Sequence, residues 1–128
     1  MIETQLKYFI ISSSSNIPEI GNRLYIGGFP DKLTYPAVVM YGISRDQMHD
    51  VPVKTDRIQF SCYADTLSSA TTIAEAIVSK LQRYTGRQST DWNYIITNSI
   101  FSNMSYLYDS GVLKYVRIVD MTVRYLET

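Results

Sequence analysis

The sequence predicts an α+β fold made of an N-terminal helix, a three-stranded antiparallel segment, a long amphipathic helix and a C-terminal β-hairpin. We expect the helices to pack on one face of a single sheet. Three observations support this class: apolar residues at helical spacing, a segment of alternating apolar and polar residues, and a closing third rich in β-forming residues around a turn. The 128 residues are the size of one ordinary domain, so residues 1–128 are expected to form a single domain.

The N-terminal helix is expected over residues 4–13. Leu6, Phe9 and Ile10 recur at helical spacing, and a serine run then ends the helix because serine competes for backbone hydrogen bonds. A short strand follows at residues 23–26, closed by the loop that begins at Gly27-Gly28.

The next segments predict a buried strand and a half-buried strand. Residues 35–43 are apolar on both faces of the pleat, which is typical of a strand buried on both sides, or on one side and against a neighbouring copy. Residues 57–64 alternate strictly. The side chains on their expected buried face are Ile58, Phe60, Cys62 and Ala64.

The long helix is expected over residues 67–84. Asp65 or Thr66 can serve as its N-cap, and Gly86 stands where a C-terminal cap belongs. Its apolar stripe comprises Leu67, Ala70, Ile73, Ala74, Ile77, Val78 and Leu81.

Two β-rich stretches, 94–106 and 114–126, close the chain. Asp109-Ser110-Gly111 between them has the turn chemistry of a hairpin. The buried parity of the last stretch changes along its length, which predicts a bulge near Ile118.

Composition favours a protein that works through its surfaces. The 12 basic and 12 acidic residues balance, which argues against tight nucleic-acid binding, because such binding depends on phosphate neutralisation. The 11 tyrosines suit half-wet protein interfaces, although many are also ordinary strand residues.

No export signal or membrane-spanning run is expected. Cys62, the single cysteine, lies on an apolar face, so we expect a buried, inert thiol.

The sequence offers few groups for catalysis. His49 is the single histidine, and a metal interpretation would combine it with Asp46 and Asp50 in one short span. Structural zinc normally takes four ligands rich in Cys and His, so a solvated polar loop is the better interpretation. Gly27-Gly28 lacks the second spaced glycine, lysine and hydroxyl residue of a phosphate loop. We therefore expect no enzyme activity, no metal and no cofactor.

The connection over residues 44–55 is long for a hairpin loop and mixes charged with apolar side chains. Exposed apolar side chains tend to dock onto a partner, while a loop with its own small contacts is the alternative. The residues of this candidate assembly-interface loop are Arg45, Asp46, Met48, His49, Asp50, Val51, Val53 and Lys54.

Taken together, the segments resemble the tail-terminator, or tail-completion (head-to-tail joining), proteins of long-tailed bacteriophages. The resembling stretches are residues 20–25, 35–41 with a Pro-x-Val-Val-x-Tyr pattern, 57–64 opening Arg-x-Gln, the alanine-bearing helix, and 119–125. The chain departs from the family where Tyr63 stands in place of a frequent tryptophan and Met40 in place of valine.

The resemblance implies a structural virion protein in the tail or neck, assembled in the host cytoplasm. It implies a homo-oligomeric ring, commonly a hexamer, that caps the tail tube, ends tube polymerisation and joins the tail to the head connector. The implied partners are further copies of the chain, the major tail-tube protein and the head connector or neck protein, with no membrane. DNA would pass through the bore without specific binding. The rival interpretations are a head-completion or neck connector protein, a small metal-dependent enzyme using Asp46, His49 and Asp50, and a monomeric adaptor with an exposed tyrosine face.

Overall fold

The computed structural model describes residues 2–12, 17–30, 34–47, 53–86 and 94–127. Its two helices and five strands follow in the order α1 (Ile2–Ser12), β1 (Leu24–Ile26), β2 (Ala37–Gln47), β3 (Val53–Ala64), α2 (Leu67–Leu81), β4 (Tyr94–Asp109) and β5 (Lys114–Glu127). Strands hold 52% of the described residues, so the fold is mainly β.

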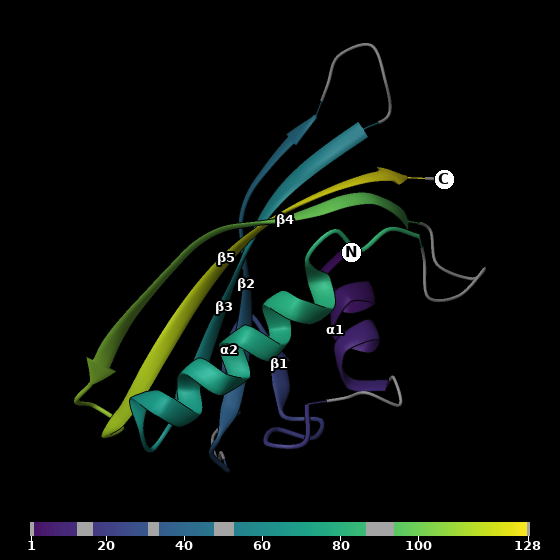
Figure 1. The fold of residues 1–128 in the computed structure, drawn as a ribbon. Coiled ribbons are helices and arrows are strands. Elements are labelled where there is room, and N and C mark those ends of the chain that lie inside the picture. Colours follow the sequence, from purple (N-terminus) through teal and green to yellow (C-terminus); the bar gives the residue numbers. More distant parts are fainter. Residues whose placement is uncertain (1, 13–16, 31–33, 48–52, 87–93, 128) are drawn as a thin grey trace.

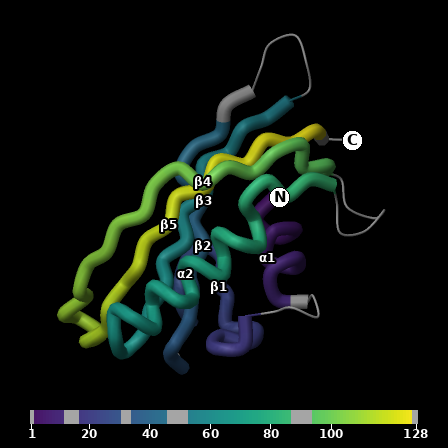
Figure 2. The backbone as a smooth tube through the Cα atoms, in the orientation of Figure 1, coloured from purple at the N-terminus to yellow at the C-terminus, as the bar shows by residue number. Residues whose placement is uncertain are grey.

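The five strands form one strongly twisted sheet in the order β1-β2-β3-β5-β4 (Figure 1). β1 runs parallel to β2, whereas β2–β3, β3–β5 and β5–β4 are antiparallel pairs. The smooth backbone trace shows α2 lying across the sheet and α1 beside β1 (Figure 2). Helix α2 packs on β3 and β5, and α1 packs on β1 and β2.

The predicted fold class is therefore wrong. The first three strands are not an antiparallel segment, because the register pairs Leu24 with Val38 and Ile26 with Met40 in parallel. The helices are short additions to a mixed sheet. The physical reason is that pairing extends the strands through polar residues, as where Gln47 lies opposite Lys54, and single-strand periodicity does not report pairing.

Helix α2 ends three residues before the predicted end, and Gly86 is not its cap. The helix begins at the N-cap Thr66, whose Oγ1 accepts a hydrogen bond from the Ser69 N–H at 3.1 Å. At the other end, Arg83 takes the left-handed conformation, with φ of 61°, that glycine usually takes after a helix. Gly86 instead pairs with Ile96 through two backbone hydrogen bonds of 2.8 Å.

The core lies between the helices and one face of the sheet. Alternate residues of β3 and β5 face the helices, and the register places Phe60 opposite Val119 and Ile58 opposite Met121. The largest fully buried side chains include Tyr125, Phe60, Ile2, Leu6 and Ile10. The predicted bulge near Ile118 is absent from the β3–β5 register, which is continuous; the irregularities lie in β2 and β4.

Candidate functional site

The two edges of the sheet differ in how much backbone they leave uncovered. At one edge, β1 pairs with only three residues of β2, and the next stretch of β2, residues 41–45, is exposed. At the other edge, β4 is the outermost strand along all its 16 residues. Large apolar side chains are exposed at both edges: Tyr41 and Ile43 on β2, and Ile100 and Phe101 on β4. Uncovered strand edges favour pairing with another chain.

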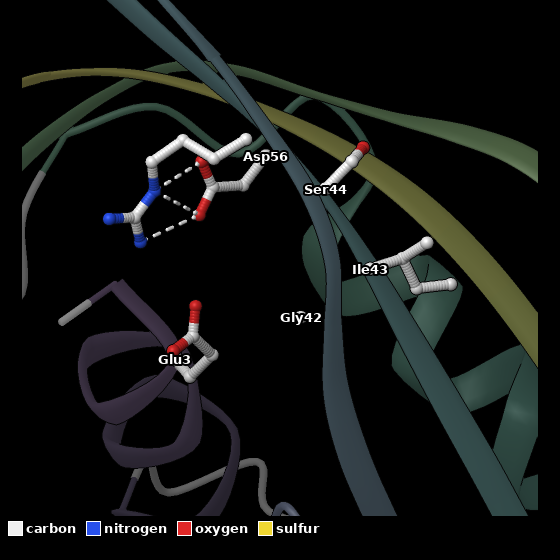
Figure 3. Close-up of a pocket in the computed structure, with 6 residues that line it drawn as sticks. Glu3, Gly42, Ile43, Ser44 and Asp56 are labelled. Atoms are coloured by element: carbon white, nitrogen blue, oxygen red, sulfur yellow. Dashed lines mark hydrogen bonds and ion pairs between the residues drawn. The ribbon is translucent and has the colours of Figure 1, made fainter.

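An open pocket of about 370 Å³ lies between the first turn of α1 and the uncovered part of β2 (Figure 3). We call it the α1–β2 pocket; it is lined by Glu3, Gly42, Ile43, Ser44, Arg45 and Asp56.

An ion pair forms one wall of the α1–β2 pocket. Nε and Nη2 of Arg45 donate to the Asp56 carboxylate at 3.1 to 3.2 Å. The Asp56 side chain is 3% exposed and also accepts a hydrogen bond from the Tyr125 hydroxyl at 3.1 Å. The hydrogen bond and charge of Asp56 raise the pKa of Arg45, and burial raises the pKa of Tyr125, with Asp56 adding to the effect. Arg45 is thus a cation whose charge is already matched.

Glu3 supplies a second carboxylate to the α1–β2 pocket. It retains only 9% of its accessible surface, and its carboxylate is directed to the side of the pocket where Asp56 lies (Figure 3). Within the described ranges, Glu3 accepts no hydrogen bond and lies in no ion pair. Gly42 leaves the pocket open beside it, because a Cβ there would stand 3.6 Å from Glu3 Oε1. The charge of Glu3 also helps to raise the pKa of Arg45, so two carboxylates face one guanidinium and the lining of the pocket has an excess of negative charge.

A second pocket, of about 480 Å³, lies at the opposite edge, where the end of α2 meets β4. We call it the α2–β4 pocket; it is lined by Gln82, Arg83, Thr85, Thr97, Asn98 and Ile100, of which only Arg83 is charged. The backbone N–H of Arg83 donates to Ser99 O at 2.6 Å, and Oε1 of Gln82 accepts from the Phe101 N–H at 2.7 Å. The Arg83 side chain is exposed and has no ion-pair partner in the part of the chain that the structure describes.

One row of paired residues joins the two pockets across the sheet. Arg45 lies opposite Asp56, Asp56 opposite Val123, and Val123 opposite Ser99. Because the Arg83 N–H is bonded to Ser99 O, the α1–β2 pocket lies at one end of this row and Arg83 at the other.

The tip of the β4–β5 hairpin is a further exposed apolar surface. Asp109 Oδ1 accepts from the Gly111 N–H at 2.9 Å and shapes the turn. Leu113 is 68% exposed and has a φ of 57°, which is unfavourable for leucine. The other exposed apolar side chains near the tip are Tyr106, Leu107, Tyr108, Val112 and Tyr115.

The predicted assembly-interface loop is largely strand at both ends. Arg45 and Asp46 belong to β2, and Val53 and Lys54 belong to β3. Arg45 contacts buried Asp56, which gives it a structural role that the sequence did not reveal. Four of the predicted interface residues lie outside the described residues: Met48, His49, Asp50 and Val51.

The metal interpretation is not tested, because His49 and Asp50 also lie outside the described ranges. Among the residues that the structure does describe, no three His, Cys, Asp or Glu side chains are grouped as metal ligands would be. Cys62 is fully buried, and burial raises the pKa of its thiol, so the thiolate needed for nucleophilic chemistry is disfavoured. Neither described helix is long and apolar enough to cross a membrane.

No sequence pattern identified Glu3 or Arg83 as a functional residue. Glu3 sits in the first turn of α1, where an acidic residue is favourable in any helix, so nothing marks it as buried. Arg83 follows the apolar stripe of α2 as an ordinary polar residue. A helix that ends on a non-glycine residue in a left-handed conformation is visible only in the structure.

Comparison of the sequence matched no protein family model and no curated protein. Comparison of the structure found a chain in the solved "Virion of native gene transfer agent (GTA) particle" with a TM-score of 0.74. The match covers 98% of this chain and 94% of that chain at 11% sequence identity. At this identity the likeness shows that the two chains share a fold.

Proposed function

We propose that this protein is a structural component of a phage-like virion that caps the tail tube as a homo-oligomeric ring. The observation that carries the proposal is the shared fold: nearly the whole length of this chain superposes on nearly the whole length of a chain from a virion particle. The resemblance of the sequence to tail-terminator proteins points in the same direction and adds the particular place, the end of the tail tube next to the head.

The sheet edges and the hairpin tip support a role in assembly. A ring needs heterologous contacts, in which one surface of a copy meets a different surface of the next. The uncovered stretch of β2 and the outer strand β4 are two such surfaces on one sheet. In the proposed role the ring is a hexamer, ends tube polymerisation and joins the tail to the head connector, while DNA passes through a bore that does not bind it.

In this role the protein caps the tail tube through the shape of its surfaces and uses no reactive group. The α1–β2 pocket is polar and open, and Arg45 and Asp56 in its wall form an ion pair. Cys62 is buried away from any substrate. The proposed function therefore involves no catalysis and no cofactor.

The test is reconstitution with purified tails and purified DNA-filled heads. We expect the protein to bind the head-proximal end of tails, and added tube subunits should then fail to extend them, as seen by electron microscopy. Binding to heads in the absence of tails would instead indicate a head-completion protein. Tubes that elongate past the bound protein would contradict the proposal.

A further inference from the structure

The α1–β2 pocket contains a group whose burial needs an explanation. Glu3 has lost nine-tenths of its accessible surface, yet none of the described residues donates a hydrogen bond to its carboxylate. A carboxylate at the wall of an open pocket, with little solvent around it, is stabilised by a cation that enters the pocket. Arg45 acts on Glu3 through its charge, but its Nε and Nη2 donors are engaged by Asp56, so two carboxylates share one guanidinium.

Arg83 has the complementary property at the other edge of the sheet. It occupies a left-handed backbone position after α2, where glycine or asparagine would be less strained, and it presents an exposed guanidinium. A planar guanidinium is well suited to a carboxylate in a pocket, because it donates two parallel hydrogen bonds.

The geometry of the sheet relates the two residues. Both pockets lie on the helix-covered side, since Asp56 shares the face of Ile58 and Phe60. Both lie on the row that runs from Arg45 to Ser99. Consider a second copy placed edge to edge with the first, at the same level along the strands, so that β4 of the second copy lies next to the uncovered part of β2 of the first. This placement brings Arg83 of the second copy to the mouth of the pocket that contains Glu3 of the first.

The strands would meet in a favourable direction. In the order β1-β2-β3-β5-β4, β4 runs opposite to β2, so the edge of one copy continues the sheet of the next in antiparallel pairing. The same placement buries exposed apolar residues of β2, such as Ile43, against those of β4, such as Ile100 and Phe101. The contact is head-to-tail, so every copy offers both halves of it.

We propose that Arg83 of one copy enters the α1–β2 pocket of its neighbour and pairs with Glu3, so that the occupant of this pocket is a second copy of the chain. This inference rests on the proposed ring and names the contact that builds it. Glu3 and Arg83 are interface residues, and Arg45 and Asp56 hold the shape of the pocket.

Charge reversal with complementation tests the pairing. Glu3→Arg and Arg83→Glu should each weaken self-association, measured by sedimentation velocity, by about tenfold or more. An equimolar mixture of the two variants should recover assembly. When the two variants alternate around the ring, every contact between residue 3 and residue 83 again joins a glutamate to an arginine. Glu75→Arg, on the exposed face of α2, is the matched control and should assemble like the wild type.

A cross-linking experiment keeps the test valid where Glu3→Arg folds poorly. Ser44 is exposed at the rim of the pocket, and Thr85 is exposed beside Arg83 in the α2–β4 pocket. Ser44→Cys combined with Thr85→Cys leaves Arg83 in place and should give a ladder of cross-linked oligomers with a short bis-maleimide. Each single variant should give no ladder, and Cys62 should not react because it is buried. Cross-linking through Ser44→Cys alone would overturn the inference, since it requires a symmetric contact.

The outcomes separate this inference from the proposed function. A wild type that caps tails, while the mixed variants show no recovery and the double-cysteine variant no ladder, overturns the Glu3–Arg83 contact and leaves the function standing. Recovery and a ladder, with no effect on tail tubes, support the contact and overturn the tail-capping function. A wild type that gives no oligomer at about 1 mM, together with a double-cysteine variant that gives no ladder, overturns the contact.

Discussion

Arg45 and Asp56 face each other on paired strands, and the guanidinium contacts both oxygens of a carboxylate that is 3% exposed. The arginine side chain is 50% exposed, so the pair joins a buried anion to a half-solvated cation. The two partners therefore differ in what their loss does to the stability of the fold. Loss of Arg45 leaves a buried carboxylate with the Tyr125 hydroxyl as its remaining hydrogen-bond donor in the described structure, whereas loss of Asp56 lets the arginine turn into water.

Removing the cation should therefore destabilise the fold. We expect Arg45→Met to lower the free energy of unfolding by about 1–3 kcal/mol, because the Asp56 carboxylate keeps its desolvation without its main partner. Urea denaturation at pH 7 measures this change. Adding Asp56→Asn in the Arg45→Met background should recover part of the loss, since the amide carries no charge. Equal losses from the single and double variants would contradict this account of the pair.

The stability of the protein should fall steeply in alkali through Tyr125. Burial and Asp56 raise the pKa of Tyr125 above its ordinary value of about 10, so above that pH the folded state holds a proton that the unfolded state has released. The contribution is complete below pH 10 and is lost as the pH rises, by up to about 1.4 kcal/mol per pH unit for one group.

Tyr125→Phe isolates this effect. The variant should lose about 1–2 kcal/mol at pH 7, because the hydrogen bond to Asp56 is gone. Between pH 10 and 11 its stability should decline less steeply than that of the wild type. Burial also raises the pKa of Tyr63 and Tyr84, so a residual slope is expected. Parallel slopes for both proteins would exclude Tyr125 as a source of the alkaline loss.

Shortening the connection between β2 and β3 tests the predicted assembly-interface loop. Gln47 pairs with Lys54, so residues 48–53 can be replaced by a two-residue Asn-Gly turn that suits this register. We expect the shortened protein to keep its stability within about 1 kcal/mol and to lose tail capping. A Gly/Ser replacement of equal length separates the loss of side chains from the loss of length. Normal capping by both variants would remove this loop from the mechanism.

Leu113 should show a conflict between stability and assembly. A leucine with φ of 57° and 68% exposure is strained and adds little packing, so Leu113→Asn should raise the free energy of unfolding by about 0.5–1 kcal/mol. If the hairpin tip docks onto a neighbouring protein, the same change should reduce binding to tails. Leu113→Ile is the control, because a β-branched residue tolerates this conformation even less and should destabilise the fold. A loss of stability in Leu113→Asn would contradict the strain argument.

Local sequence patterns were sufficient to predict the buried face of a single helix or strand. The apolar stripe of α2 and the alternation of Ile58, Phe60 and Cys62 in β3 are periodic, and periodicity is a property of consecutive residues. The turn at residues 109–111 likewise depends on its own residues, since the Asp109 side chain bonds to the backbone of Gly111.

Tertiary structure decided the rest. The parallel pairing of β1 depends on contacts between residues that are distant in the sequence, as does the extension of β2 through Arg45 to meet Asp56. Glu3 became a buried carboxylate because α1 packs against β2, and Arg83 became the cation at the far edge because α2 ends beside Ser99. The sequence by itself determined which segments are amphipathic. Which charges are buried, and which edges remain open to a partner, follows from contacts that no single segment encodes.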